Sequence, residues 1–148
     1  MAPLITLLLG SVVARVVGWV GVDFVNNWTA AISVGLAAMF VLTGIAHFAP
    51  SMRADLVAIV PPRLPAPGLL VTITGVLELV GAAGLLHPTM RVAAALCLLA
   101  LMLVMFPANV HAARMPNPPA SMSTQLRSRT AVEVVFLAAA VTVAVGGI

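Results

Sequence analysis

The sequence predicts an all-α fold, a bundle of transmembrane helices, from its composition and from the spacing of its apolar stretches. Hydrophobic residues make up 62% of the 148 residues and charged residues only 7%, and the mean hydropathy is +1.18. A chain this apolar cannot bury its side chains inside a water-soluble globule. Apolar stretches near the ~20 residues that span a bilayer occur at 3–22, 29–48, 68–86, 91–112 and 130–147. We therefore expect residues 1–148 to form a single integral membrane domain.

The first stretch, 3–22, is the least regular of these segments. Arg15 interrupts it, and glycines at positions 10, 18 and 21 weaken it as a helix. An arginine near the centre of a span is costly, so a re-entrant or interfacial helix is the alternative to a full crossing. The segment lacks the basic n-region of a secretory signal peptide, and we expect it to be retained.

The connecting segments differ in character. Residues 21–29 read as a short polar turn with Trp28 at headgroup level, and 86–91 as a tight turn. Residues 51–60 can form a short helix lying in the interface, followed by a stiff proline-rich run that ends at Pro67. Residues 115–128 are rich in proline, serine and threonine and predict a flexible polar loop.

The arginines predict the orientation of the bundle. If all five stretches cross, the loops at 49–67 and 113–129 share one face with the N-terminus. That face carries arginines at 53, 63, 114, 127 and 129, against Arg91 on the other. The positive-inside rule then places the N-terminus in the cytoplasm of a bacterial cell, with the chain in the inner membrane.

Composition also excludes some classes of function. The net charge is +3 and the isoelectric point is 11.2, but the basic residues are scattered arginines without a basic stripe, so nucleic acid is not an expected partner. Cys97 is the single cysteine. An intramolecular disulfide and a C-x-x-C thiol relay are therefore excluded.

Glu78 is the first candidate for a functional residue. It lies near the middle of the stretch 68–86, where a carboxylate costs about 2.5–3.5 kcal/mol at mid-bilayer depth. Its neighbours one turn away are Thr74, Gly75, Gly81 and Ala82, all small, so another helix can approach and enclose the carboxyl group. We expect Glu78 to be a catalytic group for proton transfer. The structural alternative is a protonated carboxyl bonded to Thr74 or paired with an arginine.

That arginine is Arg15, which falls at a depth similar to that of Glu78 and is the expected structural pair. His47, at the end of the second stretch, and Asn109, at the end of the fourth, are expected ligand-binding groups near the arginine-rich face. Phe106 lies beside Asn109 on the side of the helix that we expect to face inward, and Phe106 and Thr74 are also expected ligand-binding residues. His111 stands on the opposite side of the same helix and is expected nearer the headgroups.

Other readings of the polar residues are weaker. Glu133 is expected to be a helix N-terminal carboxylate or a partner of Arg129. A metal site built from His47, Glu78, His111 and Glu133 is not favoured, because no two of them show the spacing of helix-borne metal ligands. We expect no metal and no intrinsic cofactor, with a quinone as the cofactor that would suit the site.

An ordered set of motifs resembles the DoxX family of small bacterial membrane proteins. The motifs are Gly44-Ile-Ala-His47-Phe48, Val60-Pro-Pro-Arg-Leu-Pro-Ala-Pro67, Gly75-Val-Leu-Glu78-Leu-Val-Gly81 and Met105-Phe-Pro-Ala-Asn109. The resemblance covers about residues 30 to 147. It implies a four-helix membrane bundle, here with one extra N-terminal membrane helix, and an association with membrane redox assemblies.

Three functions remain open at this level. The preferred one is a quinone- or small-ligand-binding subunit of a membrane redox system, in which Glu78 exchanges protons. The alternative is a non-catalytic accessory or assembly subunit that packs against a larger membrane complex or a second copy of the chain. A small-solute carrier is a third, although the chain is short for one and shows no inverted repeat. Whether the protein is an enzyme is left open, and membrane lipid is the one partner that composition requires.

Overall fold

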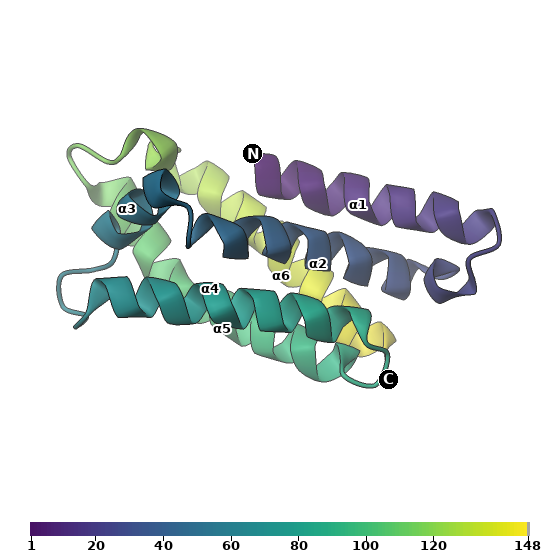
Figure 1. Ribbon diagram of the computed structural model, residues 1–148. Helices are drawn as coiled ribbons and strands as arrows, with labels where there is room; N and C mark the ends of the chain where they lie inside the picture. The colour runs from purple at the N-terminus through teal and green to yellow at the C-terminus, as the bar shows by residue number, and fades with distance from the viewer. Residues whose placement is uncertain (148) are drawn as a thin grey trace.

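The computed structural model describes residues 1–147, which form helices joined by short connections (Figure 1). The long helices are α1 (Ala2–Trp19), α2 (Trp28–Ala46), α4 (Pro67–Leu86), α5 (Arg91–Arg114) and α6 (Leu126–Gly146). A shorter helix, α3 (Pro50–Ala58), and two 3₁₀ turns, η1 (Asp23–Val25) and η2 (Ala120–Met122), lie in the connections.

All five long helices are long and apolar enough to cross a membrane. Their most apolar 18-residue windows have mean hydropathies between 1.7 and 2.2. The all-α fold and the expected order of spans are confirmed, and the chain is a multi-pass membrane protein. The first segment is one uninterrupted helix of 18 residues despite Arg15, long enough to extend about 27 Å.

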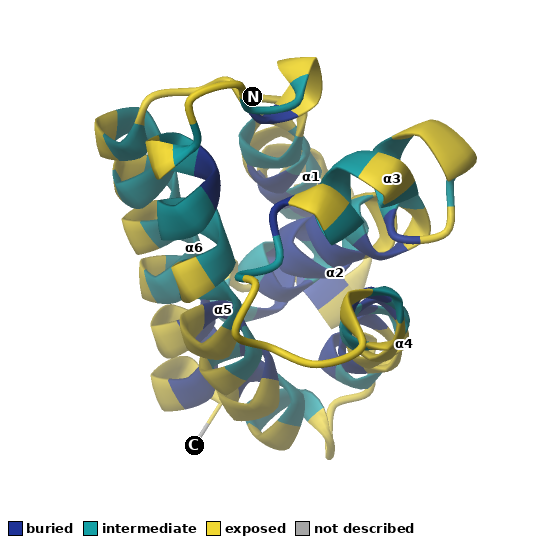
Figure 2. Ribbon diagram, turned by 90° about the vertical axis from the view of Figure 1, so that its left-hand side faces the viewer, coloured by how far each residue is buried: buried dark blue, intermediate teal, exposed yellow. Residues whose placement is uncertain are grey.

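Four of the long helices close a ring. α2 packs against α4, α4 against α5, α5 against α6, and α6 returns to α2, while α1 packs against the outside of α2. Figure 2 shows this ring from one end, with α2 as the most deeply buried helix. The arrangement is a four-helix bundle with one additional N-terminal helix, as the sequence predicts.

The α1–α2 contact depends on small residues. Leu7, Ser11, Ala14 and Gly18 are the buried residues of α1, and their spacing places them along one face. A side chain added at Gly35 of α2 would collide with the backbone of Leu7 and with Ser11. Close backbone approach at small residues is the usual way in which helices associate in lipid.

The two ends of the bundle differ. The N-terminus, α3, the proline-rich segment and the η2 loop lie toward one end, and η1, the α4–α5 turn and the C-terminus lie toward the other (Figure 1). The expected short helix is α3. The last span begins at Leu126 rather than at residue 130, so Glu133 lies two turns inside α6 and not one. The extra turn carries Arg127 and Arg129, which hydropathy alone assigns to a loop.

Candidate functional site

Glu78 is enclosed by neighbouring helices, as its small neighbours predict. It is the twelfth residue of α4 and only 5% exposed. One turn before it, a Cβ at Gly75 would meet the Cβ of His47, and one turn after it, a Cβ at Gly81 would meet the side chain of Leu98. α2 and α5 therefore approach α4 closely on either side of the carboxyl group, and Glu78 is shielded from the surrounding hydrocarbon.

The carboxyl group has partners on α2. The Thr43 hydroxyl donates a hydrogen bond of 2.6 Å to Oε2 of Glu78, and Nδ1 of His47 lies 3.8 Å from the same oxygen. Thr43 and His47 are one helical turn apart, so both side chains project from the same face of α2. A carboxyl group, a hydroxyl and an imidazole thus form one buried cluster.

The hydrogen bonds of His47 indicate which ring nitrogen carries the proton. Nδ1 lies 2.8 Å from the carbonyl oxygen of Thr43, and a carbonyl only accepts, so Nδ1 donates. In the neutral ring Nε2 is then the acceptor, and it makes no hydrogen bond within residues 1–147. His47 follows the last residue of α2 and is 4% exposed.

His47 lies deeper than we expected from the sequence. It contacts Gly75, eight residues after the start of α4 at Pro67, or about 12 Å along that helix. α2 ends below the rim of the bundle, and α3 folds over its end. This brings the imidazole within about one helical turn of the depth of Glu78.

Arg53 on α3 holds this arrangement in place, a role that sequence reasoning missed. Its guanidinium donates to the carbonyl of His47 at 3.1 Å, to the carbonyl of Gly68 at 2.9 Å and to the hydroxyl of Thr72 at 3.0 Å. The His47 carbonyl lies at the end of α2, where helical carbonyls lack partners. Arg53 therefore ties α3 to both the end of α2 and the start of α4.

A cavity of about 580 Å³ adjoins the cluster. It lies between the start of α1, the end of α2, α3, the η2 loop and α6, and Asn109 of α5 contributes to its wall. The polar side chains in its wall that can bind or exchange protons are those of Thr43, His47, Asn109, Arg129 and Glu133. Most of its apolar lining comes from Leu4, Leu42, Met52, Leu56, Ile59, Met122, Val132 and Phe136.

Asn109 and His111 face different cavities, as their opposite positions on α5 predict. Asn109 lines the 580 Å³ cavity, and its Oδ1 accepts a hydrogen bond of 3.0 Å from Arg129. His111 lines a separate groove at the end of α5. Within residues 1–147 Glu133 forms no ion pair with Arg129; it lines the same cavity as Asn109.

Two expected ligand-binding residues lie elsewhere. The Thr74 hydroxyl donates to the carbonyls of Leu70 and Val71 in its own helix, at 3.0 and 3.1 Å. This local bond is the common alternative for a helical threonine, and Thr43 of the facing helix takes the place expected for Thr74. Phe106 is half-buried and does not line the cavity.

The expected pair between Arg15 and Glu78 is not formed. The Arg15 guanidinium donates to the Asn26 side chain at 3.2 Å and lies over the rings of Trp19 and Trp28, at 4.9 and 5.7 Å from their centroids. Arg15 is only four residues from the end of α1, so its long side chain reaches the aromatic residues at the η1 end of the bundle. Cation–π stacking and one hydrogen bond stabilise it there.

Among the residues that the structure describes, no three His, Cys, Asp or Glu side chains gather where they could hold a metal ion. The carboxyl, imidazole and hydroxyl groups of the cluster can exchange protons and form hydrogen bonds, and the Asn109 amide can form hydrogen bonds in the adjoining cavity.

The fold and the site together define a multi-pass helical membrane protein with a buried polar cluster beside an internal cavity. The chain belongs to the family described as a domain of unknown function, DUF8561, whose profile matches residues 36–144. The matched residues run from the middle of α2 into α6 and leave out α1. No curated protein and no solved structure matches the chain.

Proposed function

We propose that this protein binds a small lipophilic ligand of the quinone type in its 580 Å³ cavity, as a subunit associated with a membrane redox system. The single observation that supports this most is the composition of the cavity, whose apolar wall carries an imidazole, an amide, a guanidinium and a carboxyl group at one end of the bundle. Ligand cavities are commonly of about 300–1,000 Å³, mostly apolar, with a few polar groups that orient the ligand.

The polar groups suit a ligand with two carbonyl oxygens. The Asn109 amide nitrogen is left to donate because its oxygen already accepts from Arg129. A quinone supplies reversible uptake of two electrons and two protons. Glu78 and His47 are both held by Thr43, whose hydroxyl donates to Glu78 and whose carbonyl accepts from His47, and Nδ1 of His47 lies 3.8 Å from Oε2 of Glu78. In this proposal they exchange the protons, and a separate redox enzyme of the membrane supplies the electrons.

The resemblance to the DoxX family supports the same proposal, since His47, Glu78 and Asn109 lie in the motifs that carry the resemblance. The cytoplasmic membrane of a bacterium is the proposed location. The arginines at 53, 63, 114, 127 and 129 gather toward one end of the bundle, and the positive-inside rule makes that end, with the N-terminus, the cytoplasmic one.

The test is binding of a short-tailed quinone to the purified full chain in lipid nanodiscs, measured by equilibrium titration. We expect His47→Ala to weaken binding about tenfold, the effect of losing one buried polar contact, and Glu78→Gln to weaken it less, because Glu78 lies behind Thr43 and His47 and does not line the cavity. Asp23→Asn is the matched control, because Asp23 is exposed at the opposite end of the bundle. Unchanged affinity in both His47→Ala and Glu78→Gln contradicts the proposal.

The alternative of an accessory subunit has one observation in its favour. α1 uses only one face against α2, and Leu8, Leu9, Val12 and Val13 on its other side are exposed. Gly81 and Gly84 are small residues of α4 on which a partner helix could pack, but they already contact Leu98 and Ala94 of α5 in the same chain. A partner would therefore dock on α1. Under this alternative, Leu9→Trp abolishes co-purification of a membrane partner and leaves quinone affinity unchanged.

A further inference from the structure

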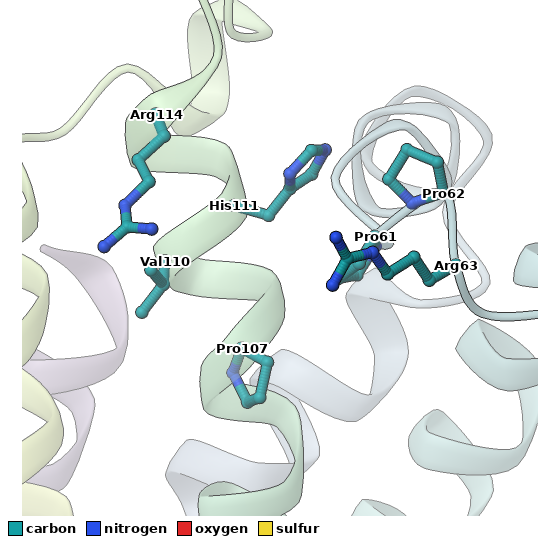
Figure 3. A pocket seen from close by; sticks show the side chains of 7 residues that line it. All are labelled: Pro61, Pro62, Arg63, Pro107, Val110, His111 and Arg114. Carbon is teal, nitrogen blue, oxygen red and sulfur yellow. The ribbon is translucent and has the colours of Figure 1, made fainter.

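A second groove, of about 470 Å³, lies at the arginine-rich end of the bundle (Figure 3). It runs between the last turns of α5 and the proline-rich segment that follows α3. Its lining residues are Pro61, Pro62, Arg63, Pro107, Val110, His111 and Arg114. None of them lines the 580 Å³ cavity, so the two sites are separate.

The groove is positively charged. Arg63 and Arg114 are both exposed, no acidic side chain is among the lining residues, and neither arginine makes an ion pair or side-chain hydrogen bond within the described part of the chain. In Figure 3 the His111 ring and the Arg63 guanidinium face each other across the groove, while the Arg114 side chain lies on the other side of α5. The other arginines toward this end include Arg53 and Arg129, whose guanidinium groups are engaged within the protein.

The apolar part of the groove is stiff. Pro61 and Pro62 have restricted backbones, so the backbone that leads to Arg63 loses little conformational entropy on binding. From Arg114 to Pro107 the groove follows α5 for seven residues, or about 10 Å. The headgroup region of a bilayer is about 5–7 Å thick on each side. A lipid whose phosphate lies near the arginines would therefore place its first acyl carbons near Pro107.

We propose that this groove binds an anionic phospholipid, with Arg63 and His111 holding the phosphate of the headgroup, Arg114 adding positive potential, and Pro61, Pro62, Pro107 and Val110 contacting its glycerol and upper acyl chains. Charge complementarity selects an anionic lipid over a zwitterionic one. A guanidinium in particular suits phosphate, since its N–H groups match two phosphate oxygens at once. The groove thereby anchors the α3–α4 connection to α5 through a lipid.

The experiment is native mass spectrometry of the full chain released from nanodiscs made of equal parts phosphatidylglycerol and phosphatidylcholine. The wild-type protein retains phosphatidylglycerol in preference to phosphatidylcholine. The Arg63→Gln, Arg114→Gln double variant loses at least about fivefold of this preference, the loss expected from the Arg63 contact. Arg127→Gln is the matched control, because Arg127 is exposed toward the same end but does not line the groove, and it behaves as wild type.

Equal retention of the two lipids by the wild type overturns the proposal. A loss of lipid preference in Arg127→Gln as large as that in the double variant also overturns it, because it would show that diffuse surface charge selects the lipid. Displacement of the retained phosphatidylglycerol by excess inorganic phosphate also overturns it, because a site for a free anion does not need the apolar wall. Circular dichroism establishes that each variant is folded. If the double variant is not folded, Arg63→Gln alone is tested, and we expect its preference for phosphatidylglycerol to fall about fivefold.

Discussion

Replacing Gly75 by alanine tests the contact on which the buried cluster depends. The added Cβ would lie 2.6 Å from the Cβ of His47, 3.0 Å from its Cγ and 3.0 Å from a ring carbon of Phe48. Ordinary contact begins at 3.4 Å, so α2 and α4 must separate by about 0.8 Å, the difference between 3.4 and 2.6 Å. The obstacle is the first carbon of a side chain at the end of a helix, which cannot rotate away.

The expected cost follows from two opposing effects. Overpacking a tight contact destabilises a protein by about 1–3 kcal/mol, and alanine in place of glycine favours a helix interior by up to about 1 kcal/mol. We therefore expect Gly75→Ala to lower the free energy of unfolding by up to about 2 kcal/mol relative to wild type, and by about 1–3 kcal/mol relative to an alanine in the same helix that meets no obstacle. The movement of His47 away from Glu78 should also weaken quinone binding.

Reversible unfolding by dodecyl sulfate in mixed micelles, followed by circular dichroism, measures the first effect. Gly68→Ala is the matched control in the same helix, because the nearest atom to its added Cβ is the Arg53 Nη2 at 3.8 Å, an ordinary contact. We expect that variant to be as stable as wild type or slightly more so. If Gly75→Ala is as stable as Gly68→Ala, the close approach of α2 at this position is wrong.

Two further predictions concern the same cluster. Thr43→Val removes the hydroxyl that donates to Glu78. It should lower the unfolding free energy by about 0.6 kcal/mol, the average for a hydrogen bond between membrane helices, and by no more than about 1.7 kcal/mol, in the same unfolding assay. Arg53→Gln leaves the carbonyls of His47 and Gly68 without their charged donor. Because the Arg53 guanidinium is only half-buried, we expect this change to lower the unfolding free energy by about 1–2 kcal/mol, and a wild-type unfolding curve would refute its tethering role.

The order of the spans and the enclosure of Glu78 by other helices can both be predicted from the sequence. Both depend on strong local signals: apolar runs of bilayer length, and small residues one turn on either side of the carboxyl group. The opposite orientation of Asn109 and His111, which line different cavities, also follows from helical geometry alone.

The partners of the polar groups could not be predicted from the sequence in the same way. Which helix supplies the hydroxyl to Glu78 depends on how α2 and α4 rotate about their axes, and Thr74 is satisfied within its own helix. One signal for Thr43 was present, since it lies one turn before His47 on the same face of α2. The position of the Arg15 guanidinium does not follow from the depth of its backbone in α1. A long side chain reaches toward the aromatic residues near it, here at the end of the helix.

The distance between the His47 ring and the Glu78 carboxyl tests the central claim most directly. Solid-state NMR of the full chain in lipid bilayers can measure it by dipolar recoupling between ¹⁵N-labelled histidine and ¹³C-labelled glutamate, with His47→Ala and Glu78→Gln assigning the signal. We predict measurable dephasing between Nδ1 and the Glu78 carboxyl carbon, because that carbon is bonded to the Oε2 that lies 3.8 Å from Nδ1. The absence of any dephasing that these two variants remove would mean that the imidazole and the carboxyl group are apart, and would contradict the proposed site.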